Sequence, residues 1–487
     1  MMSDVLSQPG LLLLIFLGVG AGILVGAVPG LTGAMLISLT LPLTFGMGGH
    51  EALTLLVSMY VGSVSGGLIT ATLLQMPGTP ASVITTLDGF PMARSGRAGR
   101  ALALGIGASF FGGILSWVVL VLLARPIAEY STALGPFEYF ALVVMALVLI
   151  AGVSGDSLVR GAFSGALGVL FALPGVAPGS GELRLTFGFE VMNDGFKLLP
   201  VLIGMFAMSR VLAGGEGGGA ERFEVAKGGL WLKLGEWRRQ LWNLVRSSVI
   251  GTGVGILPGV GANVGSLIAY STARWRSKTP GEFGKGCDEG VVASESANNA
   301  TVGGALVPLV ALGIPGSVID AILLGAFVIH GLQPGPMLFE NDPEVVGTIT
   351  STYLWANFVM AGLMLVSVRW IARLAAVPRH YLLPVVAVFC VVGSYALANR
   401  FFDVWVMLGS GVAGYLLERF RVPLAPFVIG FVLTPIGEEK LVSALMGSGG
   451  SWWPMVTRPG SLGLLCVSGL LLWWALRQRG KAEKLKR

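Results

Sequence analysis

Residues 300–332 read ATVGGALVPLVALGIPGSVIDAILLGAFVIHGL and hold two apolar runs, 300–313 and 317–332, on either side of Pro315-Gly316. Each run is too short to cross a hydrocarbon core of ~30 Å at ~1.5 Å per residue. A break in a helix at membrane depth is tolerated only where protein or a water-filled cavity surrounds it. The stretch therefore predicts a broken or re-entrant helix whose tip, at Pro315-Gly316, lies inside a protein.

The composition of the whole chain is that of a membrane protein. Of its 487 residues, 54% are hydrophobic and 12% charged, whereas about a quarter of a soluble domain is charged. At ~20 residues per span the length allows roughly 11–14 membrane segments, so we predict an all-α polytopic membrane protein. Basic residues in such proteins mainly set topology. The net charge of +6 therefore predicts contact with membrane lipids and no nucleic-acid partner.

Cysteine and histidine give no sign of a cofactor. The three cysteines and three histidines are scattered without metal-ligand spacing. We expect no cofactor, with Na⁺ as the one possible metal ion. The first ten residues, MMSDVLSQPG, have no positive n-region, so the first apolar stretch is interpreted as a retained helix.

Two Pro-Gly elements occur twice, in the same order. The first pair is Gly26-Ala-Val-Pro29-Gly30 and Gly255-Ile-Leu-Pro258-Gly259. In the second pair, Gly66 precedes Pro77-Gly78-Thr79 at the separation at which Gly304 precedes Pro315-Gly316-Ser317. The order and spacing indicate an internal repeat. Chance duplication in a glycine-rich chain remains the alternative.

Loop charges predict how the two repeats are related. The loop after Pro77-Gly78 holds Arg94, Arg97 and Arg100, whereas the loop after Pro315-Gly316 ends in the acidic stretch 340–344. By the positive-inside rule, corresponding loops then lie on opposite faces. We therefore predict two inverted-topology repeats with re-entrant or broken helices, a layout that many secondary transporters share.

The repeats predict the domain organisation. Residues 1–212 form the first membrane repeat and residues 247–440 the second. Residues 213–246 form a glycine-rich cytoplasmic linker with an interfacial amphipathic helix. Residues 441–487 form a C-terminal membrane helix and a basic cytoplasmic tail, which leaves the N-terminus periplasmic in a bacterial cell inner membrane.

Each second Pro-Gly ends at the start of a predicted helix. Thr79 and Ser317 are suitable N-cap residues, and the preceding glycines permit close backbone approach. The free N–H groups and positive dipole end of a helix N-terminus attract an anion. Two such tips, entering from opposite faces, would meet near the midplane and form an anion site. A simple tight turn remains the alternative at each tip.

Residues 290–301, GVVASESANNAT, are polar among apolar neighbours. A charge at the centre of a membrane helix costs on the order of 2.5–3.5 kcal/mol, so it needs a partner or a function. Oxygens of Ser296 and Asn298 could ligate Na⁺, and Glu295 could carry a proton. Asp320 is a further coupling-ion candidate. The alternatives are a polar packing seam and, for Asp320, a carboxylate that stabilises a helix N-terminus.

No arginine stands near the two tips in the sequence. We therefore expect co-bound cations or backbone dipoles to offset the charge of an anion there. Gly152-Val153-Ser154-Gly155 matches the GxSG of rhomboid-type intramembrane serine proteases, but such a serine needs a histidine on a neighbouring helix. His330 and His380 stand at predicted loop or interface edges. An intramembrane protease and an anion channel remain alternatives to a transporter, which would not be an enzyme.

Four stretches carry a resemblance to a known family. They are GAVPGLTGAMLISLTLPLTF, LLQMPGTPASVITTLDGFPMARSGRAGRAL, GILPGVGANVGSLIAYSTAR and FGKGCDEGVVASESANNATVGGALVPLVALGIPGSVIDAILLGAFVIHGLQPGPMLF. In these the chain resembles the large membrane subunit, the TctA-type permease, of the tripartite tricarboxylate transporter family. The resemblance implies a permease subunit that imports citrate-like tricarboxylates or related organic acids, driven by an Na⁺ or proton gradient. It also implies two partners, a small TctB-like membrane subunit and a TctC-like periplasmic solute-binding protein.

The resemblance also implies a substrate site and coupling residues. Carried over residue by residue, the substrate site comprises Pro29, Gly30, Gly78, Thr79, Pro258, Gly259, Asn298, Asn299, Pro315, Gly316 and Ser317. The coupling-ion candidates are Glu295, Ser296, Asn298 and Asp320. The chain departs from the family pattern at Gln75, where the family has Asn, and at Ser294, where it has Pro. Both departures lie at the proposed site, so the acid and the coupling ion are left open.

Overall fold

The structure, a computed structural model, describes residues 8–28, 31–75, 79–153, 157–178, 181–214, 232–258, 260–374, 379–396 and 398–486. The regular secondary structure of these residues is helical apart from one antiparallel hairpin of β1 (Gly175–Val176) and β2 (Leu183–Arg184). The predicted all-α polytopic membrane protein is confirmed. The short hairpin is an addition that the sequence analysis did not predict.

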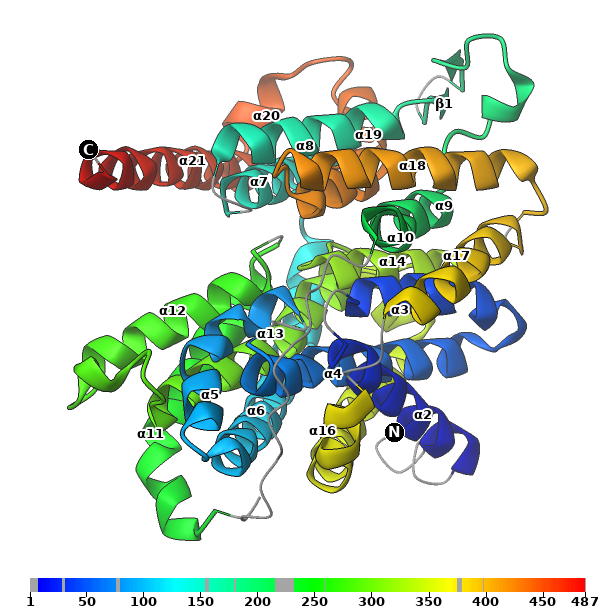
Figure 1. Cartoon of the computed structure of the whole chain (residues 1–487). Helices are drawn as coiled ribbons and strands as arrows, with labels where there is room; N and C mark the ends of the chain where they lie inside the picture. Colours follow the sequence, from blue (N-terminus) through cyan, green and yellow to red (C-terminus); the bar gives the residue numbers. More distant parts are fainter. Residues whose placement is uncertain are drawn as a thin grey trace.

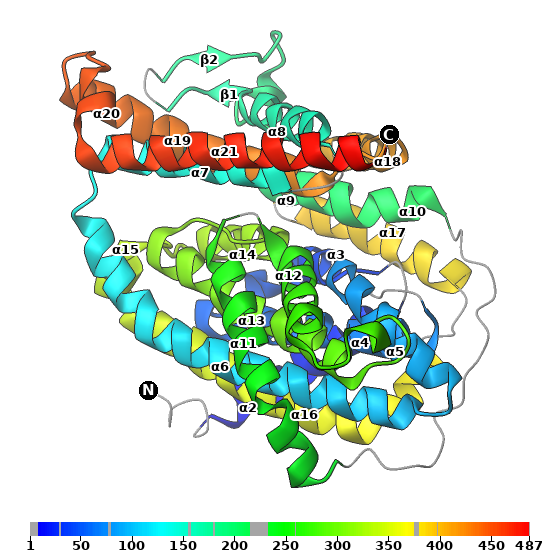
Figure 2. The same ribbon diagram turned by 90° about the vertical axis from the view of Figure 1, so that its left-hand side faces the viewer.

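Two groups of helices build the molecule, and both views separate them (Figures 1 and 2). We call them the lower body and the upper group. The lower body contains α2 (Pro9–Gly26), α3 (Gly33–Thr40), η1 (Leu41–Gly46), α4 (Gly49–Leu73), η2 (Pro80–Ser82), α5 (Val83–Arg94), α6 (Ala98–Thr132), α11 (Leu234–Ile256), α12 (Gly261–Arg276), η5 (Pro280–Glu282), α13 (Asp288–Leu312), α14 (Val318–Ile329), α15 (Pro336–Asn341) and α16 (Pro343–Leu374).

The upper group lies across the lower body. It contains α7 (Pro136–Val153), α8 (Leu158–Ala172), η3 (Glu190–Met192), α9 (Leu198–Ile203), η4 (Gly204–Met208), α10 (Ser209–Ala213), α17 (Arg379–Ala396), α18 (Phe401–Arg419), α19 (Leu424–Gly447), α20 (Trp453–Thr457) and α21 (Pro459–Lys486). Helices α9, α10 and α17 lie beneath α18, on the side of α3, in both views. Each group therefore combines helices from both halves of the sequence.

Five of the described helices are long and apolar enough to cross a membrane: α2, α4, α6, α16 (within Pro343–Val368) and α18. Shorter apolar helices of 10–17 residues accompany them, among them Leu158–Ala172 and Val318–Ile329. Outward-facing side chains such as Leu122 (63% exposed) and Val366 (68% exposed) are apolar, as contact with lipid requires. The figure of 11–14 membrane segments stays a prediction.

Helices α4 and α13 form the centre of the lower body. Both have 25 residues, and nearly every side chain of each is buried. In each half the preceding long helix packs against the central one, α2 against α4 and α11 against α13. A Cβ added at Gly22 would lie 2.5 Å from the Met59 carbonyl oxygen, and one at Gly251 would lie 2.3 Å from that of Ala297. Small residues thus let the backbones touch, which is how helices associate without a hydrophobic driving force between them.

The predicted helix breaks are confirmed. Helix α13 ends at Leu312, Gly313 follows in the left-handed region with φ of 69°, and α14 begins at Val318. In the first half, α2 ends at Gly26 and α3 begins at Gly33. A left-handed glycine after the last helical residue is a common way to end a helix.

Hydrogen bonds join the first half of the chain to the second half at two places. The buried Asp88 carboxylate, midway along α5, accepts hydrogen bonds from the Gly284, Gly286 and Cys287 backbone N–H groups at 2.8–2.9 Å and from the Tyr270 hydroxyl at 2.8 Å. These partners belong to α12 and the loop after it. At the ends of α3 and α14, Thr44 Oγ1 lies 3.1 Å from His330 Nε2. Each tie joins one helix from the first half to one from the second.

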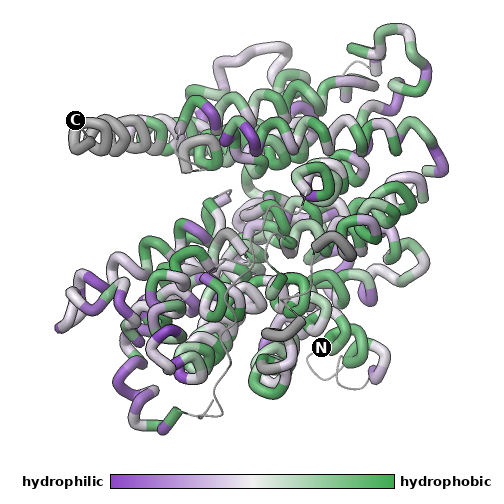
Figure 3. Tube along the Cα trace, viewed as in Figure 1, coloured by the Kyte–Doolittle hydropathy of each residue, from purple (hydrophilic) through white to green (hydrophobic). Residues whose placement is uncertain are grey.

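The predicted linker is described only in part, because 215–231 lie outside the described residues. Helix α11 begins at Leu234 and continues without a break to Ile256. The predicted interfacial helix is therefore the first half of a longer helix that enters the lower body. Hydrophilic residues gather at that end of α11 and at the far end of α12, at the lower left of Figure 3. The predicted domain boundaries stay predictions.

Replacement of Gly22 by valine should disturb the α2–α4 contact, whereas the same change at Gly20 should not. A Cβ at Gly20 meets only the Leu363 side chain, at 4.0 Å, whereas at Gly22 it would enter the α4 backbone. Overpacking of this kind costs ~1–3 kcal/mol. We expect Gly22→Val to lower the melting temperature of the purified protein in detergent, with Gly20→Val close to wild type. Equal melting temperatures for the two variants would contradict the proposed close contact.

Candidate functional site

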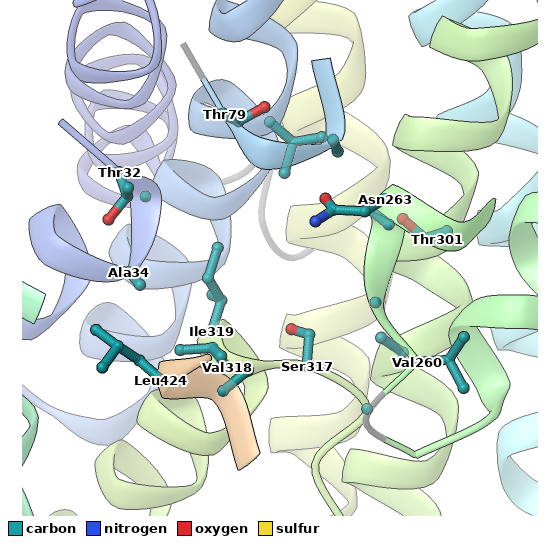
Figure 4. A pocket seen from close by; sticks show the side chains of 18 of the residues that line it. Thr32, Ala34, Thr79, Val260, Asn263, Thr301, Ser317, Val318, Ile319 and Leu424 are labelled. Carbon is teal, nitrogen blue, oxygen red and sulfur yellow. The ribbon is translucent and has the colours of Figure 1, made fainter. Parts of the chain in front are cut away.

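A cavity of about 910 Å³ lies where the upper group meets the lower body. Its lower wall contains the N-terminal ends of four helical segments, α3, η2–α5, α12 and α14, together with residues of α4, α11 and α13. Its other wall comes from α7, η4, α10 and the turn between α18 and α19. Figure 4 shows side chains from both walls turned toward a common space. The size suits a small-molecule ligand.

The junction before α3 carries the first capped N-terminus. Thr32 precedes the helix, and its hydroxyl accepts a hydrogen bond from the Met35 N–H at 3.2 Å. Thr32, Gly33 and Ala34 line the cavity. Pro29 and Gly30, which the sequence analysis assigned to the site, lie outside the described residues. The hydroxyl of Thr32 and the first turn of α3 are the described groups next to that element.

The junction before α5 is built around Thr79, which is buried and lines the cavity. Its backbone N–H donates to Ser82 Oγ at 3.1 Å, and that hydroxyl donates to the Thr79 carbonyl at 2.8 Å. The short turn η2 then leads directly into α5. Gly78 lies outside the described residues, so the position of this tip is given by Thr79.

The junction before α12 adds a residue that the sequence analysis missed. Asn263, in the first turn of α12, lines the cavity, and its amide points into it (Figure 4). Pro258 is buried but does not line the cavity, and Gly259 lies outside the described residues. The sequence could have indicated Asn263, because this residue stands at the start of a helix directly after the Pro-Gly element. Ala34 holds the equivalent position in the first repeat.

The junction before α14 is the most closely packed. Ser317 caps the helix by accepting from the Asp320 N–H at 3.3 Å, and it shares a hydrogen bond of 3.0 Å with the Tyr60 hydroxyl. A Cβ added at Gly316 would lie 2.8 Å from the Ala305 side chain and 2.9 Å from the Gly255 carbonyl oxygen. Gly316 and Ser317 line the cavity, and Pro315 is buried beside it. Only glycine fits between α13 and α11 at this point.

Equivalent residues of the two repeats line the cavity. The matched glycines Gly66 and Gly304 set an offset of 238 positions. At that offset the lining residues form five pairs: Tyr60 with Asn298, Ser63 with Thr301, Val64 with Val302, Thr79 with Ser317, and Ala81 with Ile319. At the offset between Gly26 and Gly255, the pairs are Thr32 with Gly261, Gly33 with Ala262, and Ala34 with Asn263. The cavity thus lies between two corresponding sets of residues, as a site at a repeat interface requires.

In the polar stretch of α13, some side chains line the cavity and others form hydrogen bonds within the helix packing. Asn298 lines the cavity, whereas Asn299 accepts a hydrogen bond from Ser65 of α4 at 2.6 Å and does not line it. The Ser296 hydroxyl donates to the Val292 carbonyl of its own helix at 2.7 Å. Both Glu295 carboxylate oxygens are also satisfied, by Thr85 at 2.5 Å and Ser109 at 3.1 Å. Asn299, Ser296 and Glu295 therefore have structural partners in this arrangement.

Several buried polar groups of the described residues have no such partner, and two of them, on Asn298 and Asp320, lie in α13 and α14 near the cavity. The side-chain N and O of Asn298 and both carboxylate oxygens of Asp320 have no partner at hydrogen-bonding geometry, although each residue is 0% exposed. The nearest polar groups are Glu295 for Asn298, and the Ser317 hydroxyl and N–H for Asp320. Asp320 lies in the first turn of α14, next to Ser317 and within electrostatic reach of Tyr60. Burial of a polar group without a partner is costly. These two groups are thus the best-placed in α13 and α14 to accept an ion or a ligand.

The expectation that no arginine approaches the tips was wrong. Arg210 of α10 and Arg421 of the α18–α19 turn both line the cavity. Each is far in sequence from the Pro-Gly elements, and the upper group brings them to the opposite wall. Sequence position near the motifs could not show this, because it depends on how α10 and α18 pack.

With the geometry described, comparison with known proteins identifies the chain. The model of the tripartite tricarboxylate transporter TctA family matches residues 12–429. The chain belongs to this family. TctA proteins are components of a tripartite transporter, so this TctA chain is a transporter component that works with partner subunits in a membrane.

Two relatives of this TctA chain come from Agrobacterium vitis. One, an uncharacterized 52.8 kDa protein in the TAR-I ttuC' 3' region, is 34% identical over 453 residues, covering 93% of this chain and 90% of the relative. The other, an uncharacterized protein in the TAR-II ttuC' 3' region, is 37% identical over 227 residues, covering 46% of this chain and 94% of the relative. No solved structure matches the chain. Ser154, the nucleophile of the protease alternative, lies outside the described residues.

The two neighbouring asparagines should respond differently to replacement by alanine. Asn298→Ala removes a cavity group that holds no internal hydrogen bond, so we expect unchanged thermal stability with carboxylate uptake reduced about tenfold, the loss of one ligand hydrogen bond. Asn299→Ala leaves the buried Ser65 hydroxyl unpaired and should cost ~1–3 kcal/mol of unfolding free energy. Thermal unfolding of the purified variants and uptake by reconstituted vesicles check both statements. An Asn298→Ala protein that unfolds earlier but transports normally would contradict the assignment.

Proposed function

We propose that this chain is the permease subunit of a binding-protein-dependent secondary transporter that imports tricarboxylates or related organic acids into a bacterial cell. Its partners are a small TctB-like membrane subunit and a TctC-like periplasmic solute-binding protein. Transport is coupled to an Na⁺ or proton gradient across the cell inner membrane, with the N-terminus periplasmic and the C-terminus cytoplasmic. Membership of the TctA family supports the transport role.

One observation carries the proposal: four helical segments start at the same cavity. Each start presents backbone N–H groups that have no partner within the helix, together with the positive end of the helix dipole. Hydroxyls and one amide, from Thr32, Thr79, Asn263 and Ser317, stand among them. A small carboxylate is a ligand that such a set of donors fits.

Coupling to a cation follows from the unpartnered Asp320 carboxylate. A carboxylate buried next to an anion site needs a positive charge or a proton to be stable. Asp320 stands directly behind Ser317, so a cation bound to it would favour an anion at the cavity, and the anion would favour the cation. Glu295 is less suited, since Thr85 and Ser109 already hold both of its oxygens.

Alternating access follows from the division into two groups of helices. Side-chain hydrogen bonds and ion pairs join helices within the lower body, such as Asp88 with Tyr270, and within the upper group, such as Arg184 with Glu438. The cavity lies at the seam between the groups. Movement of the lower body against the upper group would open the cavity first to one side of the membrane and then to the other.

Concentrative uptake tests the proposal. Vesicles that contain both membrane subunits, supplied with the binding protein, should accumulate labelled citrate or another organic acid above its outside concentration when an Na⁺ or pH gradient is imposed. Gly316→Leu should reduce this uptake at least about tenfold, because the added side chain occupies the cavity wall at Gly255 and Ala305. The matched control is Gly362→Leu, since a Cβ at Gly362 meets nothing within 4 Å. Flux that only equalises the two concentrations would indicate a channel instead.

Replacement of Asp320 and of Glu295 by their amides tests which of the two carboxylates takes part in cation coupling and which only forms structural hydrogen bonds. We expect Asp320→Asn to abolish the dependence of uptake on the imposed cation gradient. The amide carries no negative charge and takes up no proton, so it can neither be protonated nor attract a cation as the carboxylate does. Glu295→Gln, which keeps most of the hydrogen bonds to Thr85 and Ser109, should retain gradient-driven uptake. Uptake by Asp320→Asn that still follows the Na⁺ or pH gradient would remove Asp320 from the coupling mechanism.

A further inference from the structure

Arg421 is held in an unusual backbone conformation at the cavity. It follows the end of α18 with a φ of 58°, in the left-handed region where glycine or asparagine is the usual residue. Two backbone hydrogen bonds close the turn, from the Arg421 N–H to the Glu418 carbonyl at 2.9 Å and from the Val422 N–H to the Leu417 carbonyl at 2.7 Å. Strained residues of this kind concentrate at functional sites. The conformation places Arg421 on the cavity wall.

Arg421 is the charged residue of the cavity lining whose charge is not offset by an ion pair among the described residues. Among the described lining residues, the lysine, arginine, aspartate and glutamate side chains are Arg210, Glu418 and Arg421. Arg210 pairs with Glu418 at 2.8 Å, so these two charges offset each other. Arg421 makes no ion pair within the part of the chain that the structure describes. The upper wall therefore carries one net positive charge opposite the four helix N-termini.

The position of the turn brings this charge to the anion site. Leu424, three residues after Arg421, lies beside Val318 and Ile319 at the start of α14 (Figure 4). Arg421 itself lines the same cavity as Ser317 and Thr79. The helix N-termini and Arg421 thus line one cavity from opposite walls.

We propose that Arg421 selects substrates by the number of their carboxylate groups. One carboxylate binds at the helix N-termini of the lower body, and Arg421 binds a second carboxylate of the same molecule. A guanidinium suits this role because its planar donors bind a carboxylate at two points. A monocarboxylate can satisfy only one of the two walls. The inference rests on the proposed function and adds a specificity-determining residue to it.

Competition experiments on the reconstituted transporter test this assignment. Labelled citrate uptake is measured while unlabelled mono-, di- and tricarboxylates of similar size compete. For Arg421→Gln we expect the concentration of tricarboxylate that halves uptake to rise about tenfold or more, with little change for a monocarboxylate. Arg421→Lys should recover part of the preference. Arg419→Gln is the matched control, because Arg419 lies on the same turn, bonds to Tyr415 and does not line the cavity.

A second variant guards against misfolding as the explanation. Arg421→Gly removes the charge and suits the left-handed φ of this position, so it should unfold no earlier than wild type while it loses the preference for several carboxylates. An equal loss for mono- and tricarboxylates in both variants, or no change in either, would overturn the role of Arg421. Failure of the wild-type assembly to accumulate any carboxylate would instead count against the proposed function itself.

Discussion

The structure depends on the unpaired backbone N–H groups at the start of a helix. In a membrane these groups find no water, so a helix can begin at depth only where protein or a ligand receives them. Here four helical segments begin at one cavity. Hydroxyl groups of the chain accept hydrogen bonds from only some of their N–H groups: Thr32 accepts from the Met35 N–H, and Ser317 accepts from the Asp320 N–H. The remaining donors make the cavity electropositive without a cluster of charged side chains.

Close packing behind the cavity makes this arrangement possible. Gly251 and Gly316 have backbone or side-chain neighbours where a Cβ would lie, so α11, α13 and the junction before α14 form one compact unit. The Asp88 and Thr44–His330 ties hold the far ends of the same broken helices. Of the two polar groups without a well-formed hydrogen bond there, Asn298 lines the cavity and Asp320 is buried behind Ser317.

Much of this could be predicted from the sequence, and the failures have a common cause. Pro315-Gly316 and its counterparts predicted broken helices because local backbone chemistry determines where a helix ends, and Thr79 and Ser317 predicted cavity residues for the same reason. Asn299 and Glu295 could not be separated from Asn298 by sequence, because which face of α13 meets α4, α5 or the cavity depends on packing. Arg210 and Arg421 reach the cavity only through the upper group, which carries no motif.

The ties between the halves also bear on how the protein is made. Helix α3 pairs with α14, and α5 pairs with α12, so each pair takes one member from the early part of the chain and one from the late part. The junctions of the first half are therefore synthesised and inserted before the groups that complete their surroundings exist. The cavity is therefore complete only after the second half of the chain has been synthesised.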